Sequence, residues 1–220
     1  MGNNYFKHSK ITPYKFRLLV KNFCMDMNAT QISVMSRLNR NTVNKYISVF
    51  RSELSEFIER NDSWALPTLN EVVEKIKTFT GKENSEHLFS AEKKMVICSI
   101  DGHILTGHAA HNYNKLFLNC FKTDIGKTVV FLFSPYYSPK KFDWSEFMRL
   151  KKTLTHKQKE GNTGLSDIES FTKYFFIRLK QFKGIRSKDM LLHLRETNFR
   201  YYRSNDEMYH TILDIFRNKV

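Results

Sequence analysis

The N-terminal part of the chain has apolar residues at helical spacing. Pro13 suits the first turn of a helix, and the apolar positions after it recur at steps of three or four: Tyr14, Phe16, Leu19, Val20 and Phe23. Asn28 suits the cap of a second, short helix over residues 30–35. The pattern places Ile32 and Met35 on the inner face of that second helix.

A third helix is expected to begin near Arg40, after a turn at Leu38 and Asn39. Its inner face carries an apolar series that continues toward Asn61 and Asp62: Val43, Tyr46, Ile47, Phe50, Leu54, Phe57 and Ile58. Arg37 stands where such a turn usually has glycine, so either the turn differs or Arg37 adopts a positive φ. The break at residues 63–67 then divides a helical domain, residues 1–62, from a second domain, residues 63–220.

The middle of the chain has the pattern of a sheet. Residues 95–100 are rich in β-forming side chains, Asp101-Gly102 is a hairpin turn signal, and residues 103–106 can return as the partner strand. The nearly continuous apolar run over residues 127–133 is typical of a buried strand. A helix is expected between these segments, over residues 113–121. Residues 136–164 read as a loop-rich insertion with a short helix near residues 144–150.

The last part of the chain, residues 165–218, returns to helical spacing. Its first apolar stripe ends at Gly184 and is made of Ile168, Phe171, Phe175, Phe176, Leu179 and Phe182. Two further helices follow, marked by Leu191, Leu192, Leu194, Phe199 and Tyr202, and by Tyr209, Ile212, Leu213 and Phe216. The predicted fold class is therefore α+β (mixed), in which helices stand at both ends of a strand-rich middle.

Charge points to a polyanionic partner. The chain has 36 Lys and Arg against 22 Asp and Glu, a net charge of +14, and the excess lies in residues 1–62 and 140–220. Phosphate backbones favour such surfaces because neutralised phosphates release counterions. Three separated cysteines indicate neither a disulfide framework nor a zinc ribbon, and no apolar signal segment or membrane-length run is found. We expect a cytoplasmic protein that does not enter a membrane.

The expected third helix has the composition of a recognition helix in a helix-turn-helix domain. Arg and Asn side chains can make bidentate contacts to base edges, while Lys binds phosphates. The candidate DNA-binding residues of this region are Arg37, Arg40, Asn41, Thr42, Asn44 and Lys45, and those of the C-terminal region are Lys173, Lys180 and Lys183. The alternative is a plain helical bundle whose polar face is only solvated.

Several segments, in order along the chain, resemble the ISXO-like insertion-sequence transposases. They are Tyr5-Phe6-Lys7-His8-Ser9-Lys10-Ile11, Arg40-Asn41-Thr42-Val43-Asn44-Lys45-Tyr46, and Ile168-Glu169-Ser170-Phe171 with residues 178–185 and 192–196. The resemblance covers roughly residues 5–60 and 156–216 and is weak between them. It implies an RNase H-like core behind a DNA-reading domain, with acidic residues from two strands and a helix around two Mg²⁺ ions.

The chain departs from that family where the acidic residues are expected. Residues 70–77 contain no Asp and suit an amphipathic helix, and Ser134-Pro135-Tyr136 follows the apolar strand, so that Glu169 alone matches the acidic set. One carboxylate does not hold two Mg²⁺ ions in the required geometry. Displaced acids could take over the role: Asp101, Asp124 or Asp143. The histidines His103, His108 and His111 could share a metal, although surface or hydrogen-bonded histidines fit better.

These features favour a transposase-derived, catalytically inactive protein that binds double-stranded DNA, with Glu169 as a vestige of the site and no cofactor. The resemblance implies a bacterial, nucleoid-associated protein, and we expect a homodimer that acts as a regulatory or accessory factor. It could clamp DNA beside a larger nucleoprotein complex, such as a CRISPR effector or another nuclease. One alternative is an active, Mg²⁺-dependent transposase with displaced acidic residues. Another is a protein-interaction module that meets an acidic partner.

Overall fold

The computed structural model describes residues 11–61, 70–72, 74, 93–100, 102–110, 116–123, 126–134, 142–157, 163–182 and 184–218. The chain divides into two compact units. The helical unit comprises Met1–Asn61 and Phe199–Val220, and the sheet unit comprises Asp62–Asn198. The sequence pattern places residues 199–220 in the second domain, whereas their side chains pack with the N-terminal helices.

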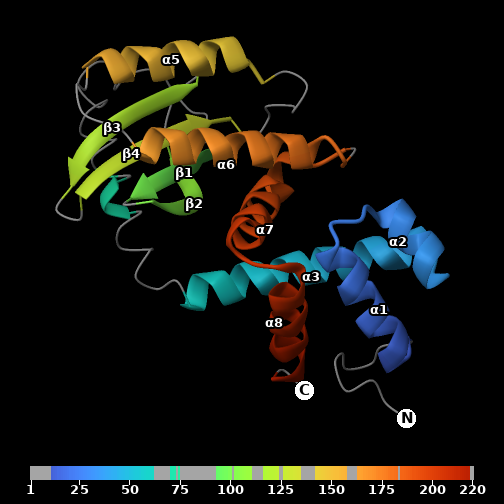
Figure 1. Ribbon diagram of the computed structural model, residues 1–220. Coiled ribbons are helices and arrows are strands. Elements are labelled where there is room, and N and C mark those ends of the chain that lie inside the picture. The colour runs from blue at the N-terminus through green and yellow to red at the C-terminus, as the bar shows by residue number, and fades with distance from the viewer. Residues whose placement is uncertain are drawn as a thin grey trace. The chain divides into compact units, whose positions relative to one another are not determined.

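The helical unit contains α1 (Pro13–Cys24), α2 (Ala29–Ser36), α3 (Arg40–Asn61), α8 (Asn205–Arg217) and the last turn of α7 (Met190–Tyr202) (Figure 1). Local signals set the helix starts. Pro13 stands in the first turn of α1, Asn28 and Gln31 form a capping box on α2, and Ser204 with Glu207 forms another on α8. The helices predicted at both ends of the chain are thus confirmed.

Three phenylalanines from distant parts of the sequence meet in the core of the helical unit. The ring centroid of Phe16 lies 5.6 Å from that of Phe50 and 5.3 Å from that of Phe216, and Phe50 lies 5.6 Å from Phe216. All three contacts are edge-on, the arrangement that aromatic quadrupoles favour. Because Phe216 belongs to α8, the core of this unit needs both ends of the chain.

The inward position predicted for Met35 is wrong. Its side chain is 57% exposed, whereas Ile32 is fully buried. The inner stripe of α2 runs instead from Ile32 to Ser36, four residues on, and the Ser36 hydroxyl donates a hydrogen bond to the Ile32 carbonyl at 2.7 Å. Ala29 also packs against this core, so positions 29, 32 and 36 form the inner stripe at helical spacing and Met35 falls beside it.

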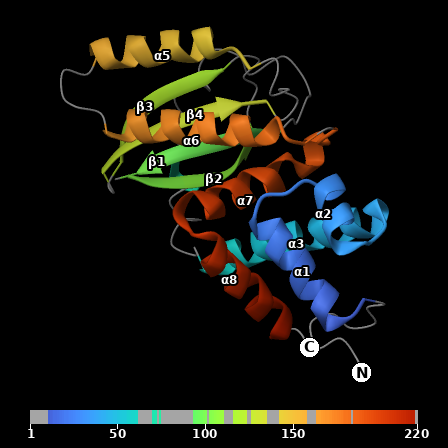
Figure 2. The same cartoon turned by 45° about the vertical axis from the view of Figure 1, so that its right-hand side comes forward.

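The sheet unit is built on four antiparallel strands in the order β2-β1-β4-β3 (Figure 2). They are β1 (Lys93–Ile100), β2 (His103–Ala110), β3 (Phe117–Thr123) and β4 (Gly126–Phe133). The predicted hairpin and the buried apolar strand are both confirmed, with Gly102 at φ 83° in the hairpin turn. The helix predicted over residues 113–121 is wrong, since Phe117–Thr123 pairs with β4 as a strand.

The two faces of the sheet bury different partners. One face packs Ile97, Phe131 and Phe133 against α5 (Trp144–Lys157), α6 (Thr163–Leu179) and the first turns of α7. On the other face, Val96, Cys98 and Leu132 pack with Val72, which lies in a helical segment as the pattern of residues 70–77 predicts. Helix α5 runs to Lys157 and is longer than the short helix expected at residues 144–150.

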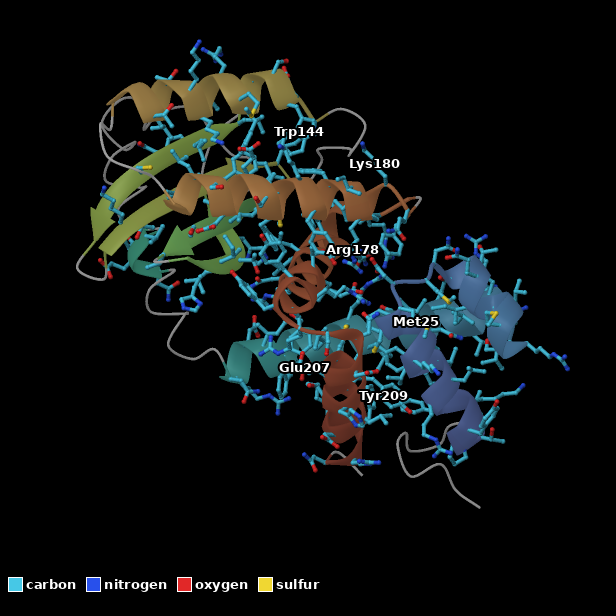
Figure 3. The ribbon with its side chains drawn as sticks, viewed as in Figure 1. Met25, Trp144, Arg178, Lys180, Glu207 and Tyr209 are labelled. Atoms are coloured by element: carbon cyan, nitrogen blue, oxygen red, sulfur yellow. The ribbon has the colours of Figure 1, made fainter. Side chains whose placement is uncertain are left out.

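A buried ion pair joins α6 to α7 inside the sheet unit. Arg178, on the last turn of α6 (Figure 3), is paired with Glu196, and both side chains are 1% exposed. The Arg178 guanidinium also donates a hydrogen bond to the Thr197 hydroxyl at 2.7 Å and lies 5.4 Å from the ring centroid of Phe182. A charge this deeply buried requires such partners, so the network fixes how α6 and α7 pack.

Candidate nucleic-acid interface

The turn between α2 and α3 is held by hydrogen bonds at both of its ends. The Ser33 hydroxyl donates to the Leu38 carbonyl at 2.7 Å, and the Leu38 N–H donates to the Ser33 carbonyl at 3.3 Å. Asn39 caps α3, because its side-chain oxygen accepts from the Asn41 N–H at 2.8 Å. Arg37 takes the left-handed conformation at φ 52°, the second of the two outcomes that its position allows.

The outer face of α3 carries the predicted polar residues. Arg40, Asn41, Asn44 and Lys45 are exposed, and Thr42 is half-buried. With 3.6 residues per turn, Asn41, Asn44, Lys45 and Ser48 fall on one side of the helix, opposite Val43 and Ile47 in the core. Sequence reasoning missed Ser48, although its spacing of four residues from Asn44 places it on the same face.

Charge is segregated along α3. No Asp or Glu occurs from Met27 to Ser52, and the acidic residues of the helix, Glu53, Glu56 and Glu59, all lie in its second half. Among the described residues, none forms an ion pair with Arg37, Arg40 or Lys45, and all three side chains are exposed. The end of the helical unit that contains α2, the turn and the start of α3 is therefore electropositive, and its cations are available to an anionic partner.

Arg200 holds the C-terminal end of α1, just before α2 begins. Its guanidinium donates to the Phe23 carbonyl at 2.6 Å and to the Cys24 carbonyl at 2.7 Å, at the C-terminus of α1. Its Nε lies 3.7 Å from the Asp26 carboxylate, and its Cζ lies 5.0 Å from the Phe23 ring centroid. A cation suits the negative end of a helix, so Arg200 fixes where α1 ends and α2 begins. Nothing in the local sequence signals this contact.

Glu169, the residue that matches the transposase acidic set, is held by two lysines. It pairs with Lys151 of α5 and, at 2.6 Å, with Lys173 one helical turn later on α6. These ammonium groups, Lys151 first, lower the pKa of the carboxyl below its ordinary value. Lys173, predicted to bind DNA, is thus engaged within the sheet unit, whereas Lys180 just beyond α6 is exposed (Figure 3). Lys183 lies outside the described residues.

The candidate replacement acids do not gather around Glu169 in the described part of the chain. Asp143 caps α5, accepting hydrogen bonds from the Ser145 hydroxyl at 2.6 Å and from the Glu146 N–H at 3.0 Å. These bonds, the one from the Ser145 side chain first, lower the pKa of Asp143. Asp101 and Asp124 lie outside the described residues, and none of the four strands contains Asp or Glu.

Histidines do not form a metal site among the residues described. His103 and His108 lie on β2, His103 exposed and His108 half-buried, and His111 falls outside the described ranges. Within those ranges, no group of three His, Cys, Asp or Glu side chains is placed to hold a metal ion. Every helix in the same ranges is also too short or too polar to cross a lipid bilayer.

Comparisons with known proteins add no relative. The chain matches no protein-family model, no curated protein and no solved structure. The chemically distinctive residues are the cations at the α2–α3 end of the helical unit, which form no ion pair with a described residue, and the lysine-held Glu169 of the sheet unit.

Proposed function

We propose that the protein binds double-stranded DNA through the turn after α2 and the first half of α3, and that its sheet unit does not cleave DNA. The observation that carries this proposal is the segregation of charge along α3. A helix that enters a major groove lies between two phosphate backbones, and acidic side chains there are repelled. The stretch from Met27 to Ser52 has none.

The side chains on the outer face of α3 are suited to two kinds of contact with a duplex, one to base edges and one to phosphates. Asn41 and Asn44 can pair with the adenine edge, which offers one donor and one acceptor in the major groove. Arg40 and Lys45 flank them and reach phosphates or guanine. A plain bundle with a solvated polar face would not require the acidic residues of α3 to be confined to its second half.

The loss of cleavage is supported by the partners of Glu169. Two-metal phosphoryl transfer needs several carboxylates around the ions. Here the one matching carboxylate, Glu169, is paired with the ammonium groups of Lys151 and Lys173. These groups neutralise the negative charge that would otherwise attract a metal cation. We therefore propose a transposase-derived DNA-binding factor. Following the same resemblance, we expect a homodimer, which sedimentation at micromolar concentration tests.

Fluorescence anisotropy with a labelled duplex, measured across a salt series with random duplex as competitor, tests the proposal. Arg40→Ala and Lys45→Ala should each weaken binding and make the salt dependence shallower by about one unit of slope. Glu169→Gln should leave affinity unchanged and should not alter nicking of supercoiled plasmid in Mg²⁺.

Arg60→Gln is the matched control for these variants. It removes one positive charge from the same helix, at an exposed position in the last turn of α3. If it weakens binding as much as Arg40→Ala, the contact depends on overall charge and not on the first half of α3. Unchanged affinity in both Arg40→Ala and Lys45→Ala would exclude the proposed interface, and Mg²⁺-dependent nicking lost in Glu169→Gln would favour an active transposase.

A further inference from the structure

Two non-glycine residues in the described part of the chain have positive φ, and both end helices of the helical unit. They are Asp26 at φ 57°, after α1, and Arg37 at φ 52°, after α2. The left-handed region is disfavoured for residues with a Cβ, although Asp and Asn tolerate it better than most. Arginine has no such tolerance, so Arg37 is the more unusual of the two.

The conformation of Asp26 is used inside the protein. Its N–H donates to the Phe23 carbonyl at 2.9 Å, and its carboxylate lies 3.7 Å from the guanidinium of Arg200. The side chain therefore contributes to the brace at the end of α1. An aspartate in this position joins a tolerated backbone conformation to an internal ion pair.

Arg37 has the same backbone role, but its side chain forms no ion pair with a described residue. Its N–H donates to the Val34 carbonyl at 3.4 Å, the bond that ends α2, and glycine would meet that geometry without strain. The guanidinium is exposed and forms no ion pair with any described residue. The described part of the chain therefore gives no structural reason for an arginine at this position.

We infer that Arg37 is retained for its guanidinium, which binds a DNA phosphate next to the first turn of α3, at the expense of stability in the helical unit. The inference rests on the proposed DNA binding and assigns one contact within it. Strained residues persist where the surrounding structure holds them and their side chains serve a function. Arg37 stands three residues before Arg40, so both cations flank the cap of α3 at Asn39.

Arg37→Gly in the full chain separates the two roles, because it keeps the turn and removes the guanidinium. The thermal midpoint should rise by about 2 °C, since the strain of the Cβ is relieved. Affinity for the labelled duplex should fall about fivefold at about 0.1 M salt, with a salt slope shallower by about 0.9. Arg37→Lys keeps both the charge and the strain, so its midpoint should match wild type and its affinity should fall less than in Arg37→Gly.

Three results would overturn the inference. A lower midpoint in Arg37→Gly would mean that the arginine serves the fold, for example by offsetting the negative end of α2. Affinity equal to wild type in Arg37→Gly, while Arg40→Ala weakens binding, would leave the DNA-binding proposal standing and remove Arg37 from it. If wild type itself binds no duplex at low salt, both ideas fall together, and a raised midpoint in Arg37→Gly would then report strain without a phosphate contact.

Discussion

The cations at the α2–α3 end of the helical unit and those on α5 and α6 of the sheet unit differ in whether they form ion pairs with described residues. At the α2–α3 end of the helical unit, Arg37, Arg40 and Lys45 are exposed and form no ion pair with a described residue. In the sheet unit, Lys151 and Lys173 share one carboxylate, and a second ion pair is buried between α6 and α7. Net charge alone does not distinguish the two groups of cations. They differ in whether an acidic side chain of the same chain pairs with them, and cations without such an ion pair are the better candidates for binding DNA.

Removing α8 should give the largest effect, because it should unfold the helical unit while the sheet unit stays folded. Deletion of residues 204–220 takes away five buried side chains of the helical unit: Met208, Ile212, Leu213, Ile215 and Phe216. We expect this unit to unfold and duplex binding to be lost, because each large core truncation costs about 3–5 kcal/mol. Both tryptophans, Trp64 and Trp144, lie within Asp62–Asn198, so their fluorescence should still show a cooperative urea transition of the sheet unit.

Point variants on α8 give the control for that deletion. Phe216→Ala leaves the helix in place but opens a cavity beside Phe16 and Phe50, and should destabilise the helical unit by about 3–5 kcal/mol. His210→Ala, on the exposed side of α8, should change stability by less than about 0.5 kcal/mol. If the deletion instead abolishes the tryptophan transition as well, the two units are not independent in stability.

Breaking the buried ion pair should be the next largest effect, in the sheet unit. Arg178→Met leaves the Glu196 carboxylate in the interior without its guanidinium, and should cost about 3–5 kcal/mol in urea unfolding followed by tryptophan fluorescence. The double variant Arg178→Met with Glu196→Leu should recover much of this loss, because no charge is then left buried. A double variant no more stable than Arg178→Met would indicate that hydrogen bonds, such as the one to Thr197, dominate the network.

Glu169→Gln should give the smallest effect, which depends on pH. The lysines lower the folded-state pKa of Glu169, so the ion pairs stabilise the fold above the unfolded pKa, about 4.3, and this stability is lost as pH falls through the folded pKa. Wild type should exceed Glu169→Gln by about 1 kcal/mol or less at neutral pH. Urea unfolding at about pH 7 and about pH 4 measures the difference, which should shrink on acidification. A difference that grows would contradict the assignment.

The sequence predicted the secondary structure correctly where the apolar face of a single helix determines it. It failed where pairing or contact with a distant segment determines the structure. The stripes of α3 and α8 could be read from spacing alone, and so could that of α1 except for Tyr14, which is 68% exposed. The run from Phe117 to Phe121 has apolar residues at steps that suit either a helix or a strand, and only pairing with β4 makes it a strand. Likewise, one of the two lysines on Glu169, Lys151, comes from α5, eighteen residues earlier, a contact that no local pattern encodes.

The candidate site was predicted in part. The exposed residues of α3 follow from the helix period, and Arg37 was identified at a position that favours glycine. That those cations form no ion pair with a described residue could not be read from the sequence, because it depends on where the acidic residues lie in the fold. Arg200, which holds the end of α1, was missed for the same reason.

The helical unit is made of two stretches of chain, and this has a consequence during synthesis on the ribosome. Helices α1 to α3 emerge first, but Phe216 emerges only after the whole of Asp62–Asn198 has been made. At about 5–20 residues per second this interval lasts roughly 8 to 30 seconds. During that time the apolar faces around Phe16 and Phe50 lack their final cover. A nascent or prematurely terminated chain would therefore carry the α3 residues without the folded unit that presents them, so the DNA binding proposed for this unit should arise only after Phe216 has been made.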